Sequence, residues 1–132
     1  MEQHKKNAFA IAKWLQKQPC VKYVLYPGLE NHPGYEINKA QTTGFGGMIS
    51  FAVDSAETAR QILEGVKLIK FAESLGGTES LITYPIRQTH TDLTAEECAE
   101  KGITDCLLRF STGIEATQDL IDDLAQAFAA AE

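Results

Sequence analysis

The sequence predicts a single α/β domain built as a two-layer sandwich, in which a small, mostly antiparallel sheet is covered by helices on one face. Two observations carry this prediction. Apolar residues recur with helical period at both ends of the chain, and short runs of β-forming residues alternate with period two between them. With 132 residues and no internal repeat or linker, residues 1–132 are expected to fold as one unit.

The first half of the chain is expected to begin with a helix from Glu2 to about Gln18. Its apolar residues recur at i, i+3, i+4 and i+7, and Pro19 ends the pattern. A loop rich in proline and glycine separates the next elements. These are, in chain order, a strand at Val21–Leu25, a short helix at 36–41 and a strand at Met48–Val53.

Two capping boxes mark helices in the second half. Asp54 with Glu57 predicts a helix that ends near Gly65, and Thr94 with Glu97 predicts a short helix that Gly102 ends. The remaining elements are expected to be a short strand at Lys67–Ala72, a short strand at 80–83, a strand at Cys106–Ser111 and a final helix at about Thr117–Ala130.

Composition excludes several classes of function. Twelve basic against eighteen acidic residues give a net charge of −6, which argues against nucleic-acid binding, because phosphate contacts need a clustered excess of lysine and arginine. No apolar run has the length of a membrane span, and the first residues lack the core of a signal peptide. A cytoplasmic protein without membrane contact is expected.

The cysteines and histidines are interpreted as structural, and the last-helix aspartates as a solvated face rather than a metal site. Three cysteines are an odd number without C-x-x-C spacing, and three scattered histidines show no metal-ligand spacing, so neither a disulfide framework nor a metal site is expected. The aspartates are expected to lie on a solvated helix face. The residues concerned are Cys20, Cys98, Cys106, His4, His32, His90, Asp119, Asp122 and Asp123.

Arg109 is the residue whose position most clearly requires a specific interaction partner. It is one of three arginines and lies inside an apolar strand, where alternation puts it on one face with Leu107 and Ser111. A guanidinium there needs an anionic partner or a route to solvent. The pattern alone favours the ordinary solutions, a side chain that reaches water or an ion pair with an internal carboxylate such as Glu79. A bidentate bond to the carboxylate of a ligand is the functional alternative.

Several segments in one order and spacing resemble a known family. The most specific are Ala72–Leu81, which contains Ser-Leu-Gly-Gly, and Leu107–Glu115, which contains Leu-Arg-Phe-Ser-Thr-Gly. Shorter segments at 26–29, 32–36, 44–51 and 84–90 agree. Together they resemble the C-terminal domain of the pyridoxal-phosphate-dependent enzymes of Cys/Met metabolism. That family includes cystathionine β-lyase, cystathionine γ-synthase and the γ-lyases, and it implies the small domain of a fold-type I transferase.

The resemblance implies roles for four residues. The family's arginine in the Leu-Arg-Phe-Ser motif binds the substrate carboxylate, which gives that role to Arg109. The family's serine in Ser-Leu-Gly-Gly lies beside the same carboxylate, which makes Ser74 a second ligand, although a serine before two glycines is otherwise ordinary turn chemistry. Thr89 matches the threonine of the family's Met-Thr-His motif. With Leu75 it is expected to support the site without touching the substrate.

The resemblance also implies that this chain carries substrate-binding residues but not the lysine that binds the cofactor. The family holds its cofactor through a lysine in a Ser-x-Thr-Lys context, and none of the nine lysines has these neighbours. We therefore expect no catalytic lysine, no bound pyridoxal phosphate and no activity in this chain alone. Residues 1–4 resemble the interior of the family's inter-domain helix. The implied whole is a longer, tetrameric enzyme of methionine and cysteine metabolism, with a separate cofactor domain and a cystathionine-like amino-acid substrate.

Two matters stay open. The segments 83–85 and 88–90 resemble bacterial β-lyases and γ-synthases more than γ-lyases, but they do not distinguish a β-lyase from a γ-synthase. The alternative function is a stand-alone, non-catalytic α/β module that binds an amino acid or a partner protein. Composition and fold class are equally compatible with that reading.

Overall fold

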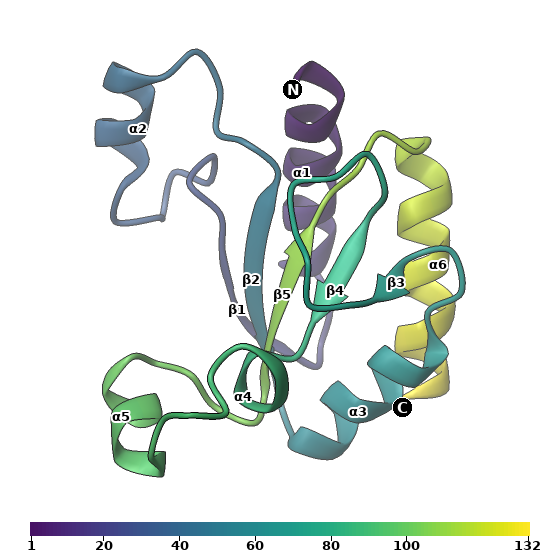
Figure 1. The fold of residues 1–132 in the computed structure, drawn as a ribbon. Coiled ribbons are helices and arrows are strands. Elements are labelled where there is room, and N and C mark those ends of the chain that lie inside the picture. Colours follow the sequence, from purple (N-terminus) through teal and green to yellow (C-terminus); the bar gives the residue numbers. More distant parts are fainter.

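Five strands form one mixed sheet in the order β1-β2-β5-β4-β3, and all its pairings are antiparallel except the parallel pair β3–β4. The computed structural model describes all 132 residues (Figure 1). The strands are β1 Val21–Leu25, β2 Met48–Val53, β3 Lys70–Phe71, β4 Leu81–Thr83 and β5 Leu107–Ser111. The helices are α1 Glu2–Leu15, α2 Tyr35–Gln41, α3 Ala56–Gly65, α4 Pro85–Gln88, α5 Ala95–Glu100 and α6 Thr117–Ala130.

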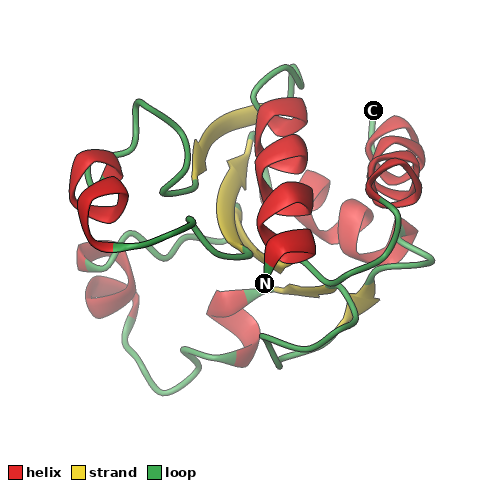
Figure 2. Cartoon of the chain, turned by 90° about the horizontal axis from the view of Figure 1, so that it is seen from above, coloured by secondary structure: helices red, strands yellow, loops and turns green.

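The layered arrangement confirms the predicted fold class. Helices α1, α3 and α6 pack on one face of the sheet, whereas α4 and α5 lie beyond its lower end in Figure 1. Seen from above, the strands form a curved layer, and α2 stands apart on the side away from α6 (Figure 2). None of the six helices combines the length and apolar character that crossing a bilayer requires.

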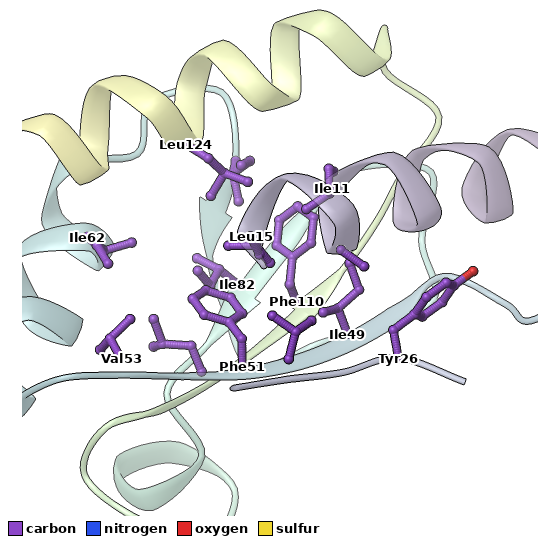
Figure 3. Packing of buried hydrophobic residues seen from close by; sticks show 14 of the residues in the cluster. Ile11, Leu15, Tyr26, Ile49, Phe51, Val53, Ile62, Ile82, Phe110 and Leu124 are labelled. Carbon is purple, nitrogen blue, oxygen red and sulfur yellow. The ribbon is translucent and has the colours of Figure 1, made fainter. Parts of the chain in front are cut away.

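The core lies between the sheet and the covering helices. Phe51 of β2 and Phe110 of β5 point towards the helices, where Ile11 of α1 and Leu124 of α6 meet them (Figure 3), and all four side chains are fully buried. Burial of side chains of this size contributes about 1.5–3 kcal/mol each, which fixes the register of the strands. Strand β5 lies in the middle of the sheet, where hydrogen bonds to β2 on one side and β4 on the other hold its backbone in place.

Helix α3 begins one residue later than predicted. Ser55, in extended conformation, is the N-cap, and its hydroxyl accepts the N–H of Thr58 at 3.1 Å. The predicted capping box of Asp54 and Glu57 is therefore wrong. Glu57 instead accepts hydrogen bonds from Arg60 one turn along the helix. The second box is confirmed, since Thr94 and Glu97 bond reciprocally at the start of α5.

Other predicted boundaries shift as well, and α2 and β4 each differ by one residue at their start. Helix α1 ends at Leu15 rather than Gln18, and β5 begins at Leu107, one residue after the half-buried Cys106. The predicted strand at Lys67–Ala72 shrinks to Lys70–Phe71. The reason is local, because the N–H groups of residues 67–69 bond to the carboxylate of Asp123 instead of a neighbouring strand.

Candidate functional site

Arg109 stands at the middle of β5 on the face of the sheet that α1, α3 and α6 leave uncovered. Its neighbours Leu108 and Phe110 are fully buried on the core side, which confirms the alternation predicted for this strand. The cross-strand partners of Arg109 are Ser50 on β2 and Thr83 on β4. A half-buried guanidinium is thus flanked by two hydroxyl side chains on a rigid surface.

The guanidinium of Arg109 makes few bonds within the chain. Nη2 donates to the carbonyl oxygen of Glu73 at 3.1 Å and to Oγ1 of Thr83 at 3.4 Å. Nε is buried and has no hydrogen-bond partner. The chain's ion pairs involve only Lys5 and Arg60 as cations, and the considered pairing of Arg109 with Glu79 is not present. The donors of Arg109 therefore have no carboxylate within this chain, although a fork of this kind suits one.

The segment 72–80, which we call the Ser74 loop, lies over the same face as Arg109. Thr83 Oγ1 donates to the carbonyl of Ala72 at 2.6 Å, and Ser111 Oγ accepts the N–H of Gly76 at 2.9 Å. On the far side, His4 of α1 bonds through Nε2 to the carbonyl of Gly77 at 3.1 Å. Together with the bond from Arg109 to Glu73, these contacts hold the loop at both ends of its Ser74–Leu75 apex.

Ser74 and Leu75 are exposed at this apex, and Leu75 is 53% exposed. Ser74 directly follows Glu73, whose carbonyl accepts from Arg109, so the structure brings Ser74 and Arg109 to one place. The hydrogen bonds of Thr89 are all local. Thr89 bonds to His90 Nδ1 at 2.6 Å and to the carbonyl of Pro85 at 3.4 Å, both within its own turn, and makes no hydrogen bond to the Ser74 loop.

A buried polar network beside the loop was not predicted. Glu115 accepts both the N–H and the hydroxyl of Ser80, and Ser80 Oγ accepts the N–H of Gly113. Asn7 of α1 donates to the carbonyls of Gly113 and Glu115. One signal was available for Asn7, because it stands four residues before Ile11 and therefore on the apolar stripe of its helix. A polar residue on such a stripe indicates a specific partner.

Metal-ligating side chains and cysteine thiols are the other groups that could carry chemistry. No group of three or more histidine, cysteine, aspartate or glutamate side chains could hold a metal ion. Burial raises the pKa of the thiols of Cys20, where Asp54 adds to the effect, and of Cys106, where the hydrogen bond to Asp105 adds to it. Both thiols are thus disfavoured as thiolate nucleophiles.

The match to a family model covers residues 1–129 and carries the description Cys/Met metabolism PLP-dependent enzyme. The chain belongs to this family. The cystathionine gamma-lyase of Dictyostelium discoideum is 52% identical over 128 residues, which are 96% of this chain and 33% of that protein. Relatives named cystathionine gamma-synthase, cystathionine beta-lyase and L-methionine gamma-lyase match at 44–50% identity. The family resemblance is confirmed, while the type of family member stays open.

Solved structures of family members have the same fold. Cystathionine gamma synthase from Xanthomonas oryzae pv. oryzae, in complex with aminoacrylate and cysteine, superposes with a TM-score of 0.94 at 43% identity and covers 99% of this chain. Cystathionine gamma-lyase from Lactobacillus plantarum, complexed with L-serine, gives 0.94 at 39% identity and covers 98%. The chain spans about a third of the length of these relatives, namely 34% of each solved chain.

The family cofactor, pyridoxal phosphate, does not fit the residues around Arg109. The cross-strand neighbours of Arg109 are Ser50 and Thr83, and no lysine stands beside it in the sheet. Eight of the nine lysines are exposed, and the ninth, Lys5, pairs with Glu2 on α1. The face therefore offers hydrogen-bond donors but no amine beside Arg109 that could form a Schiff base with the aldehyde of the cofactor.

Proposed function

We propose that this chain is the substrate-recognition domain of a pyridoxal-phosphate-dependent transsulfuration enzyme, in which Arg109 binds the α-carboxylate of an amino-acid substrate and Ser74 assists. The observation that carries the proposal is the guanidinium of Arg109. It is held in the central strand, its Nε is buried without a partner, and no carboxylate of the chain pairs with it. Leaving such a group without an anion costs free energy, and a substrate carboxylate would offset that cost.

The geometry also supports the role of Ser74. The bond from Arg109 Nη2 to the Glu73 carbonyl fixes the residue before Ser74, and the Ser111–Gly76 bond fixes the loop two residues after it. A hydroxyl on a loop tethered this way can add one hydrogen bond to a carboxylate that Arg109 already orients. Thr89 and Leu75 stay supporting residues in the proposal, Leu75 as the other residue of the exposed apex.

The chemistry of the whole enzyme needs the cofactor, which when bound acts as an electron sink for the carbanion formed at the α-carbon of an amino acid. The proposed task of this chain is orientation. Two parallel hydrogen bonds from a guanidinium fix the direction of a carboxylate as well as its position, and correct orientation is a large part of catalysis by such enzymes. The proposed partners are a cofactor-binding part of a longer polypeptide and further copies in a tetramer.

The test is the effect of Arg109→Lys and Arg109→Ala on kcat/KM in the full-length protein that carries this segment. Removing the Arg109 guanidinium should reduce transition-state stabilisation by roughly 2–5 kcal/mol, as for truncation of a buried charge pair. This corresponds to a loss of about thirty- to several-thousand-fold in kcat/KM. Arg109→Lys keeps the charge and loses the fork, so its loss should be smaller but still large. An Arg109→Ala enzyme that keeps most of its activity would overturn the assignment.

The type of family member follows from the keto acid released from L-cystathionine by the same protein. Pyruvate identifies β-elimination, and 2-oxobutyrate identifies a γ-lyase. Formation of cystathionine from cysteine and an acylated homoserine identifies a γ-synthase. Absence of all three activities would return the non-catalytic binding module to consideration.

A further inference from the structure

Thr83 touches both Arg109 and the Ser74 loop with a single buried hydroxyl. It is 1% exposed and stands directly across from Arg109 in the pairing of β4 with β5. Its Oγ1 lies 2.6 Å from the carbonyl oxygen of Ala72 and 3.4 Å from Nη2 of Arg109. No other side chain contacts both the guanidinium and the base of the loop through hydrogen bonds.

The direction of these hydrogen bonds is fixed by chemistry. A carbonyl oxygen can only accept, so the one hydroxyl proton of Thr83 is donated to Ala72. A guanidinium can only donate, so the oxygen of Thr83 accepts from Arg109. The result is a chain of bonds from Arg109 through Thr83 to Ala72, in which each bond polarises the next.

The same guanidinium nitrogen is tied to the next residue of the loop. Nη2 of Arg109 donates to the Glu73 carbonyl at 3.1 Å, while Thr83 holds Ala72. Hydrogen bonds thus tie Ala72 and Glu73, two consecutive residues of the loop, to Thr83 and Arg109. Ser74 is the next residue, and its Cα lies about 3.8 Å from that of Glu73. The other terminal nitrogen, Nη1, makes no hydrogen bond within the chain and is available to a ligand.

We infer that Thr83 is a positioning residue for carboxylate recognition, whose hydroxyl holds the Arg109 fork and the Ser74 loop in one mutual orientation. The inference rests on the proposed function of Arg109 and deepens it. Thr83 does not touch the substrate itself. It commits Nη2 to the loop, which leaves Nη1 to bind a ligand and keeps Ser74 within reach of the same carboxylate.

The test compares Thr83→Val with Thr83→Ser in the full-length protein that carries this segment. Valine keeps the shape of threonine and removes the hydroxyl, whereas serine keeps the hydroxyl and removes a methyl group. The probes are L-serine and L-serinamide, which differ only in the carboxylate, and the measured quantity is the ratio of their dissociation constants by calorimetry. A smaller folded fraction weakens both ligands equally, so the ratio reports orientation rather than stability.

We expect Thr83→Val to lower the preference for serine over serinamide by about tenfold, the effect of one hydrogen bond to a charged group. Thr83→Ser should keep the preference within about twofold of the unmodified protein. The inference is overturned if Thr83→Val keeps the preference, or if Thr83→Ser loses it to the same degree as valine.

Arg109→Lys separates this inference from the proposed function. If the unmodified protein shows no preference for the carboxylate, or if Arg109→Lys leaves the preference intact, the proposed function itself fails. If Arg109→Lys removes the preference and Thr83→Val does not, the role of Arg109 stands and the positioning role of Thr83 falls.

Discussion

Glu115 binds Ser80 with both oxygens of its carboxylate. Oε1 accepts the backbone N–H of Ser80 at 2.7 Å, and Oε2 accepts its hydroxyl at 2.8 Å. Ser80 lies at the end of the Ser74 loop, and Glu115 lies in the turn between β5 and α6. Two segments that leave the same end of the sheet are thereby joined next to the candidate site.

Glu115→Gln is expected to lower the free energy of unfolding by about 1–3 kcal/mol. The amide keeps one acceptor oxygen, but it loses the charge and turns an NH₂ group towards the Ser80 hydroxyl, so at least one charge-assisted bond is lost. Urea unfolding measures the change. Glu30→Gln is the control, because Glu30 is exposed and makes no side-chain hydrogen bond or ion pair. Equal stabilities of the two variants would contradict the role of Glu115.

Gly113 is expected to tolerate no side chain. A Cβ there would collide with the carbonyl oxygen of Thr78 and lie 2.6 Å from the carbonyl carbon of Glu79. The clash is with backbone that Ile114 already holds, since its N–H donates to Thr78 at 2.9 Å. Gly113→Ala should therefore cost about 1–3 kcal/mol or more, as overpacking of a tight site does.

Gly46→Ala is the matched control for Gly113→Ala. Gly46 has φ of 75°, and a Cβ there meets nothing within 4 Å, so its cost of about 1 kcal/mol comes from backbone strain alone. The thermal unfolding temperatures of the two variants give the comparison. A smaller loss for Gly113→Ala than for Gly46→Ala would show that the loop moves aside.

The elements carrying the site were predictable, because their signals are local. Alternation in 106–111 put Arg109 opposite Leu108 and Phe110, and the structure agrees to within one residue at the strand's start. The final helix was predicted at about Thr117–Ala130 and has these bounds in the structure. The cap of α3 was missed by one position because Asp54 and Ser55 are both good caps, and the backbone of Ser55 is the one in extended conformation next to the first helical residue.

Asp123 shows what the sequence could not reveal. It was expected on a solvated helix face, yet it is 7% exposed, and its carboxylate accepts the N–H groups of Lys67, Leu68 and Ile69 at 2.8–2.9 Å. Those partners lie more than fifty residues away in the chain. Only the docking of α6 beside α3 brings them together, and no local pattern records that contact.

Asp123→Asn is accordingly expected to destabilise the fold by about 1.5–3 kcal/mol, the range for hydrogen bonds to a charged group. An amide oxygen accepts fewer N–H groups and carries no charge. Asp122→Asn is the adjacent control, since Asp122 is exposed and accepts only from Gln118 one turn away. Chemical denaturation of both variants decides the matter, and a loss at position 122 equal to that at 123 would refute the buried role of Asp123.

Tyr26 is expected to make stability fall at alkaline pH. Burial raises the pKa of its phenol to about 12, whereas an unfolded tyrosine titrates near 10. The unfolded chain then loses its proton first, so the contribution of Tyr26 is complete below about pH 10 and is lost as the pH rises through about 12. Its size is on the order of 2 kcal/mol.

Tyr26→Phe separates this effect from other titrations. The variant loses the hydrogen bond from the phenol to the Gly46 carbonyl at 2.9 Å and should be less stable at neutral pH. Because phenylalanine does not titrate, the difference from the unmodified protein should shrink between about pH 10 and 12. Urea unfolding across this range measures it, with the exposed Tyr23→Phe as control. A difference that stays constant with pH would contradict the burial of the phenol.

The 132-residue chain alone should form no specific lysine adduct with pyridoxal phosphate. A cofactor lysine needs neighbours that bind the phosphate and ring, and here eight lysines are exposed while the ninth, Lys5, pairs with Glu2 on α1. Incubation with the cofactor, borohydride reduction and peptide mass spectrometry should give low modification spread over many lysines. The same reaction in urea is the control, because unfolding should leave the pattern unchanged. A stoichiometric adduct at one lysine that disappears in urea would mean that this chain holds a cofactor site of its own, and the division between substrate recognition and cofactor binding would have to be abandoned.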